Sequence, residues 1–521
     1  MPRTGRRRRI YGAVGLALCC LPVSAPRPAL ADPIPDGRGR DAVPAYLGAP
    51  AVPEPIPGRP VPANPHMGPP GYAAMHADSH ASDTYPFLGP MGHDPQVLTE
   101  AKANGLPGLC STVNRARRSG LLVAQCTRVG TFTLRLIDPR TLKDLAVHEL
   151  PGRPSTVQAV TGLELDKVLT DTSGGAYFYL DSQDRAVLAD SAFRIRRFAH
   201  VRTPKGWRFK VVDDWDLRKH VPHSCPTWTK PKPEGECDPV TSVQPDWKGL
   251  IWWVTRKGRI GTLDPRSGRI RVLRLKGEEI QNSFAASRDG VSIVSDHALY
   301  RLRADARGRP KVLWRETYDR GVRRKSGQID RGSGTTPTFL GDRAEYVAIT
   351  DNAEPRMNVL VHRARDGKRL CKVPVFQKNK SAGDNSLIGF GRSLVVENNS
   401  GYRNFVELAP GASSVGGLSR VDITSHGCRT VWTSKERSPS TVAKASVPGG
   451  LVYAYTKEPR RDGIDAWYLT AIDFHTGRTA YKVLTGTGKY FDNNWAPINL
   501  GPDGTAYIGV VGGLVAVRDR R

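Results

Sequence analysis

Leu451–Arg478 reads LVYAYTKEPRRDGIDAWYLTAIDFHTGR, and the pattern of this stretch decides the fold. Apolar runs at 451–456 and 469–473 are separated by a polar segment that contains Asp-Gly, which favours two antiparallel strands joined by a turn. The second run ends at Asp473, and Thr476-Gly477 follows. Aspartate accepts hydrogen bonds from turn amides and glycine adopts positive φ, so a further hairpin turn is expected here.

The same order of elements recurs along the chain, and each unit opens with a short polar cluster. The clusters are Ser111-Thr112-Val113, Ser155-Thr156-Val157, Thr241-Ser242-Val243, Asn282-Ser283-Phe284, Thr335-Thr336-Pro337, Asn385-Ser386-Leu387, Ser440-Thr441-Val442 and Asn494-Trp495-Ala496. Such a repeat predicts an all-β fold, a single β-propeller, with eight blades by this count and seven as the alternative. The last unit, Asn494–Arg518, lacks an outer strand, and residues near Val97–Lys102 are expected to supply it and close the ring.

Two of the turns carry an Asp-x-x-Thr/Ser-Gly motif, namely Asp264-Pro265-Arg266-Ser267-Gly268 and Asp473-Phe474-His475-Thr476-Gly477. Here the chain resembles the quinoprotein-dehydrogenase-like propellers; Asp138-Pro139-Arg140-Thr141 matches without the glycine. The resemblance implies a fold and, as one functional alternative, a pyrroloquinoline quinone-dependent oxidoreductase. Many alcohol dehydrogenases of that group have adjacent cysteines, whereas the adjacent pair of this chain is Cys19-Cys20, near the N-terminus.

The first 31 residues are typical of a secretory signal peptide. Arg3 and Arg6–Arg9 precede an apolar stretch at 10–23, and Ala29-Leu30-Ala31 forms a small-residue cleavage site. A secreted, extracellular protein without a transmembrane span is therefore expected. A lipid anchor on Cys19 or Cys20 and export by the twin-arginine route are the alternatives. The expected division of the chain is a signal peptide at 1–31, a linker or lid at 32–95 and the propeller at 96–521.

The segment 32–95 is rich in Pro, Gly and small polar residues, so it is expected to be mostly extended or disordered. Residues 75–84 are dense in hydrogen-bonding groups and are predicted to fold across the mouth of the propeller as a lid. The segment also contains a large share of the His and Met residues, which are copper ligands and leave a copper-binding arm as an alternative. They are His66, Met67, Met75, His76, His80, Met91 and His93.

Six of the eight cysteines lie beyond the predicted signal peptide, and an even number favours disulfides outside the cell. The predicted pairs are Cys110–Cys126, Cys225–Cys237 and Cys371–Cys428, the last of which ties neighbouring blades. A zinc site made of His220, His223, Cys225 and Cys237 is the alternative interpretation of that loop.

The formal net charge is +27, and about +21 remains without the first 31 residues, which contain six arginines and no acidic residue. A basic surface attracts anionic partners such as cell-wall polymers. Because the Arg and Lys residues are scattered and not interleaved with aromatic residues, no specific nucleic-acid partner is expected. The protein is expected to be a monomer.

Polar side chains gather in two classes of turn that share one face of a propeller: those that enter the inner strands and those between the second and third strands. The candidate ligand- or metal-binding residues are Asn282, Thr335, Asp351, Asn352, Asp384, Asn385, Glu397, Asn398, Asn399, Asn493 and Asn494. Converging carboxylate and amide oxygens suit calcium, with His297 as a candidate catalytic base. The ordinary structural explanation is that Asn and Asp are common turn residues.

The chain has no nucleophile elbow, zinc-protease helix, phosphate loop or dinucleotide fingerprint. The main functional prediction is therefore a non-catalytic scaffold that binds a small molecule or an anionic wall polymer at the polar face of its central channel. The alternatives are a calcium-assisted extracellular hydrolase or lactonase-like enzyme and the quinone-dependent oxidoreductase.

Overall fold

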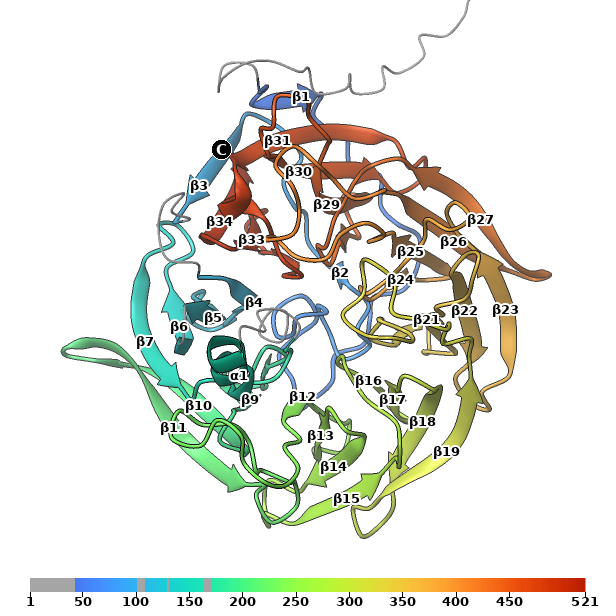
Figure 1. Cartoon of the computed structure of the whole chain (residues 1–521). Coiled ribbons are helices and arrows are strands. Elements are labelled where there is room, and N and C mark those ends of the chain that lie inside the picture. Colours follow the sequence, from blue (N-terminus) through green and yellow to red (C-terminus); the bar gives the residue numbers. More distant parts are fainter. Residues whose placement is uncertain (1–42, 101–107, 129–130, 163–170, 521) are drawn as a thin grey trace, which may run out of the picture.

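Eight antiparallel sheets stand around a central axis in the computed structural model, which describes residues 43–100, 108–128, 131–162 and 171–520 (Figure 1). In seven of the sheets, four strands follow the order of the chain from the centre to the rim. The middle strands are almost wholly buried, because both of their faces pack against neighbouring blades. The predicted eight-bladed propeller is thus confirmed. The signal-peptide prediction at 1–31 lies outside the described residues.

The first four blades consist of β4 (Cys110–Arg115), β5 (Leu122–Arg128), β6 (Thr131–Ile137) and β7 (Asp144–Leu150); β8 (Tyr179–Leu180), β9 (Ala186–Ala189), β10 (Arg194–Thr203) and β11 (Gly206–Asp216); β12 (Val240–Pro245), β13 (Ile251–Thr255), β14 (Arg259–Leu263) and β15 (Ile270–Arg274); and β16 (Ala285–Ser287), β17 (Gly290–Val294), β18 (Ala298–Ala304) and β19 (Pro310–Thr317).

The next three blades consist of β20 (Thr338–Leu340), β21 (Tyr346–Thr350), β22 (Asn358–Arg363) and β23 (Arg369–Pro374); β24 (Ile388–Phe390), β25 (Ser393–Glu397), β26 (Leu418–Thr424) and β27 (Gly427–Ser434); and β28 (Lys444–Ser446), β29 (Leu451–Lys457), β30 (Ala466–Asp473) and β31 (Thr479–Thr487). The eighth contains β32 (Ile498–Leu500), β33 (Ala506–Val510), β34 (Gly513–Asp519) and β3 (Pro95–Thr99). Strands β1 (Tyr46–Gly48) and β2 (Thr84–Tyr85) add to the seventh, and the helical elements are α1 (Pro154–Gly162) and η2 (Lys489–Phe491).

The hairpin predicted from 451–478 is present. Strands β29 and β30 pair antiparallel with Leu451 opposite Asp473. In the turn that follows, the amide of Thr476 donates to the Asp473 carboxylate over 2.6 Å, and Gly477 has φ of 72°. The Asp264 turn has the same construction, with Gly268 at φ of 67°.

The ring closes as expected, because a strand from before the first blade completes the last. Strand β3 pairs antiparallel with β34, and Val97 lies opposite Val517. The Asp519 carboxylate also accepts hydrogen bonds from the amides of Met91 (2.6 Å) and Gly92 (3.1 Å). The eighth blade thereby has four strands like its neighbours, with β3 as its outermost strand.

One predicted blade opening was wrong. Ser155-Thr156-Val157 lies in helix α1 and not in an inner strand; the inner strand of the second blade is β8. Ser and Thr favour helix starts as well as strand-entry turns, and Pro154 fits the first position of a helix. The blade count is unchanged because β8 opens the missing unit.

The three predicted disulfides are present. Cys110–Cys126 joins β4 to β5, Cys225–Cys237 closes the loop after the second blade, and Cys371–Cys428 joins the outer strands β23 and β27 of neighbouring blades. Since Cys225 and Cys237 are bonded to each other, the zinc interpretation of this loop was wrong. Neither helix of the described chain has the length and apolar composition of a membrane span.

The Pro- and Gly-rich segment runs through the middle of the ring, as its blue trace shows (Figure 1). It is mostly without regular strands, as expected of an extended chain, but residues 43–95 are not a disordered linker: residues 75–85 are all buried. They lie against the inner strands of the blades. Residues 32–42 lie outside the described residues.

We call residues 64–85 the plug, because they bind the inner strands of the blades. In six inner strands, one backbone amide donates a hydrogen bond to a carbonyl of the plug. Examples are Ala286 to Ser79 (2.6 Å), Gly389 to Ser82 (2.9 Å) and Ala445 to Asp83 (2.9 Å). The remaining backbone donors of this kind are Arg115, Leu180 and Phe339. The third blade contributes the Gln244 side chain and the Pro245 carbonyl, and Tyr85 packs with Ile498 and Leu500 of the eighth. The plug thereby satisfies edge groups that an open channel would leave to solvent.

Candidate functional site

The predicted polar residues lie on one face of the ring, which we call the entry face. Because the strands of a blade are antiparallel, the turns that enter the inner strands and the turns between second and third strands share this face. Asn282, Thr335 and Asn385 each lie three residues before an inner strand, and Asp351 and Asn398 directly follow second strands.

The structure brings four of these polar side chains together with Gln281 into one group, the amide–carboxyl cluster. Its predicted members are Asp384, Asn385, Glu397 and Asn399. The Asn385 amide donates to Glu397 Oε2 over 2.9 Å, and the Asp384 N–H donates to Asn399 Oδ1 over 3.0 Å. Gln281 Nε2 lies 3.3 Å from both carboxyl oxygens of Asp384. The cluster therefore joins the entry turns of the fourth and sixth blades with the second turn of the sixth.

Asn282 extends this group toward the second blade. Its amide donates to the Gly334 carbonyl, and its Oδ1 accepts a hydrogen bond from the Tyr177 hydroxyl over 3.1 Å. A Cβ at Gly334 would lie 2.2 Å from Asp384 Oδ1, so only glycine permits this close approach. Sequence reasoning missed Tyr177 and Gln281. Tyr177 lies two residues before the inner strand β8, so its position in an entry turn could have indicated it. It was missed because the opening of the second blade was assigned to Ser155.

A second group links the sixth blade to the eighth across the seventh. Asn398 holds the long loop after β25 by donating to the carbonyls of Lys380 (2.9 Å) and Gly416 (2.8 Å). From that loop the Tyr402 hydroxyl reaches Asp492 Oδ1 (2.8 Å) and Asn494 Oδ1 (3.3 Å). This tyrosine was not among the predicted residues.

Asn493 anchors the eighth-blade end of this second group. Its amide donates to the Gly509 carbonyl over 2.9 Å, while its Oδ1 has no hydrogen-bond partner among the described residues.

The remaining candidates serve turns of the fifth blade. Asp351 accepts hydrogen bonds from the backbone and side-chain amides of Asn358, both over 2.7 Å. Asn352 donates to the carbonyls of Arg320 (3.1 Å) and Arg323 (3.0 Å). The Thr335 hydroxyl accepts from the Thr350 amide over 3.3 Å. For these three residues the ordinary turn explanation accounts for the contacts.

His297, the predicted base, has both ring nitrogens engaged. Its Nδ1 lies 2.8 Å from Asp296 Oδ1, and an Arg320 amino group donates to its Nε2. The same arginine also pairs with Asp296. Through these contacts His297 helps to hold a charged turn together with Asp296 and Arg320.

Burial controls the ionisation of the entry-face carboxyls. It raises the pKa of Glu397 and of Asp492 to about 7, and it raises the pKa of Asp384 well above its ordinary value. The group therefore favours neutral carboxyls bonded to amides, whereas calcium needs ionised oxygens that converge on one point. Among the described residues, no group of three or more His, Cys, Asp or Glu side chains is arranged to hold a metal ion.

The centre of the channel holds a buried polar network that ties the plug in place. Asp83 accepts from the Lys444 ammonium, and both groups are fully buried. His76 Nδ1 lies 3.1 Å from Asp83 Oδ1 and 2.9 Å from the Ser386 hydroxyl, while its Nε2 lies 3.1 Å from that of Thr336. Every one of these groups is satisfied within the protein.

The histidines of the plug also pack against aromatic side chains of the blades. The His76 ring stacks on Tyr177 with 6.0 Å between ring centroids, and His80 packs against Phe339. The plug therefore occupies the space between the inner strands. Two residues of the predicted copper-binding arm, His76 and His80, are thus buried and make contacts within the propeller.

No protein-family model matches the chain. An uncharacterized protein of Archaeoglobus fulgidus is 26% identical over 311 residues, which cover 53% of this chain and 60% of that protein. This chain thus spans about three-fifths of the relative's length.

Several solved structures are similar. BamB from Moraxella catarrhalis is 14% identical over 64% of this chain and 93% of its own, with a TM-score of 0.37. The computationally designed Ika8 protein is 12% identical (81% and 98% covered, TM-score 0.40). The Cps50 (Swd1) β-propeller domain of Myceliophteria thermophila is 9% identical (81% and 99% covered, TM-score 0.38).

Proposed function

We propose that this protein is a secreted binding propeller, a rigid scaffold that holds its ligand on the entry face. The observation that carries the proposal is the plug: it fills the channel and binds the inner strands, so a ligand has a face of the ring and not its interior available to it. The three disulfides support an extracellular location.

The chemistry of the entry face favours a neutral polar ligand. Its amides, and carboxyls whose pKa burial raises, offer hydrogen-bond donors and acceptors. The Thr441 hydroxyl and Asn493 Oδ1 are buried in entry turns and have no hydrogen-bond partner among the described residues, so a ligand reaches them only if these turns open. Hydroxyl and amide groups of a wall glycan or peptide are suitable partners for such atoms.

Soluble oligosaccharides of N-acetylglucosamine, which carry hydroxyl and amide groups and no charge, are a suitable probe. The wild type is expected to bind them saturably in isothermal titration calorimetry, and Thr441→Val is expected to weaken binding at least fivefold while the fold is retained. Ser292→Ala is the matched control, because Ser292 is another buried hydroxyl without a partner and lies in the middle of β17.

Equal losses in both variants, or no binding by the wild type, would contradict the proposal. Calcium-dependent turnover of an ester or lactone that disappears in Asp384→Asn would replace it with the hydrolase alternative.

A further inference from the structure

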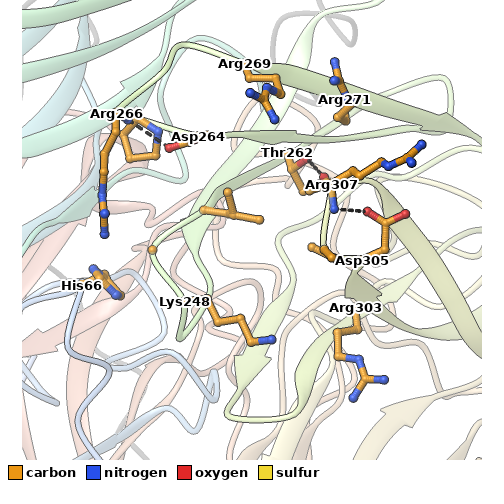
Figure 2. Close-up of a pocket in the computed structure, with 16 residues that line it drawn as sticks. His66, Lys248, Thr262, Asp264, Arg266, Arg269, Arg271, Arg303, Asp305 and Arg307 are labelled. Atoms are coloured by element: carbon orange, nitrogen blue, oxygen red, sulfur yellow. Dashed lines mark hydrogen bonds between the residues drawn. The ribbon is translucent and has the colours of Figure 1, made fainter.

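A pocket of about 670 Å³ lies on the face opposite the entry face, between the third and fourth blades. Its walls are the first and third turns of the third blade and the third turn of the fourth. Figure 2 shows Arg266 and His66 on one side and Arg303, Asp305 and Arg307 on the other.

The pocket is strongly cationic. Six of its lining residues carry positive charges and two carry negative charges. The cationic residues are Lys248, Arg266, Arg269, Arg271, Arg303 and Arg307. All but the half-buried Arg271 are exposed, and none of the six forms an ion pair with a carboxylate in the described part of the chain.

The two aspartates do not neutralise these arginines, because both are used by their own turns. Asp264 accepts from the Arg266 amide (3.0 Å) and the Ser267 hydroxyl (2.7 Å), and Asp305 accepts from the amides of Arg307 (2.8 Å) and Arg309 (2.9 Å). Arg266 and Arg307 therefore occupy the same position, two residues after the aspartate, in the turns of successive blades.

The walls of the pocket are fixed before any ligand arrives. The Thr262 hydroxyl donates to the Gly308 carbonyl and joins the two blades. The His66 amide donates to Asn64 Oδ1 over 3.0 Å, and Asn64 donates to the Pro245 carbonyl over 3.0 Å. His66, at the start of the plug, thereby packs on Gly249 and forms a third wall. A site that needs little rearrangement loses less binding free energy to ordering.

We propose that this pocket binds an oligophosphate, a short chain of two or more linked phosphate groups. Arginine forks pair with phosphate oxygens through two hydrogen bonds, and five of the six cationic residues are arginines. Phosphate concentrates more charge in a given volume than a carboxylate does, which matches a net excess of four positive charges around a small pocket. The site is separate from the entry face, and its proposal is independent of the proposed function.

Titration with sodium tripolyphosphate tests the assignment. At 50 mM NaCl the wild type is expected to bind one equivalent, and Arg266→Gln/Arg307→Gln to bind at least tenfold more weakly. Arg140→Gln is the matched control: its amide donates to Asp138 over 2.8 Å at the same turn position, but Arg140 does not line the pocket. The control and Thr441→Val are expected to bind within twofold of the wild type, with melting temperatures showing that every variant is folded.

Three results would overturn the assignment. Absence of wild-type binding would do so, as would equal losses in the double variant and Arg140→Gln, which indicate general charge attraction. Equally tight binding of citrate at the same concentration would overturn the phosphate preference and leave a general anion site.

Discussion

Glu397 is a carboxyl that the fold buries at the end of β25, where Asn385, Ser438 and the Ala443 amide hold it. The residue was predicted as a ligand for a cation. Its surroundings instead favour the protonated form, since burial raises its pKa from 4.5 to about 7. Sequence placed it on the correct face but contained no information on the depth of burial, which depends on the loop after β25 and on the neighbouring blade.

The raised pKa makes stability depend on pH. A carboxyl whose pKa is higher in the folded than in the unfolded state contributes its full stabilisation of the fold below the unfolded pKa. For Glu397 that contribution is lost as the pH rises through about 7. Glu397→Gln cannot ionise, so relative to the wild type it is expected to gain up to about 3 kcal/mol of unfolding free energy between pH 5 and pH 8. Urea unfolding at four pH values measures the change.

The exposed Glu234 gives the control for that experiment. Glu234→Gln is expected to leave the pH profile as in the wild type, because its side chain is exposed in a loop. If the unfolding free energies of the wild type and of Glu397→Gln differ by the same amount from pH 5 to pH 8, the burial argument is contradicted.

At the scale of elements, the strands were well predicted and the plug was not. The hairpin at 451–478, the Asp turns and the closing strand β3 follow from local pattern and turn chemistry. The plug has no such pattern, because its order comes from hydrogen bonds to strands up to 370 residues away in sequence, such as that of Lys444 to Met75. Composition correctly indicates that residues 64–85 are mostly without regular strands, with β2 as the exception, but it does not show what they bind.

The Lys444–Asp83 pair is the predicted weak point of the plug. Burial lowers the pKa of Lys444, and Asp83 is fully buried beside it. Lys444→Met leaves that carboxylate without its cation, so a loss of about 3–5 kcal/mol is expected. Chemical unfolding measures the loss, and limited proteolysis is expected to show faster cleavage within residues 64–85.

A double variant separates charge from packing. Asp83→Asn/Lys444→Met removes both charges and is expected to recover a substantial part of the lost stability. If the double variant is as unstable as Lys444→Met alone, the contribution of the pair lies in packing and not in charge compensation.

At the scale of the whole molecule, the blades are held by covalent as well as hydrogen-bonded links. Cys371 and Cys428 are 57 residues apart and join two blades, whereas Cys225 and Cys237 are 12 apart within one loop. Loop-closure entropy predicts that removing the first bond by double Cys→Ser substitution costs about 4 kcal/mol and removing the second about 3 kcal/mol.

Calorimetry on the two double variants checks this order. The inter-blade variant is also expected to unfold over a broader temperature range, because the fifth and sixth blades lose a link. A lower melting temperature for Cys225→Ser/Cys237→Ser than for the inter-blade variant would contradict the expectation.

The plug has a consequence for the order of folding. The residues that leave the ribosome early, 64–85, find partners as distant as Ala445, and β3 waits for β34 at Gly513–Asp519. Contacts between segments so far apart in sequence form slowly. A segment made early is thus among the last to settle, and a chain cut short before residue 513 lacks the partner strand that closes the ring.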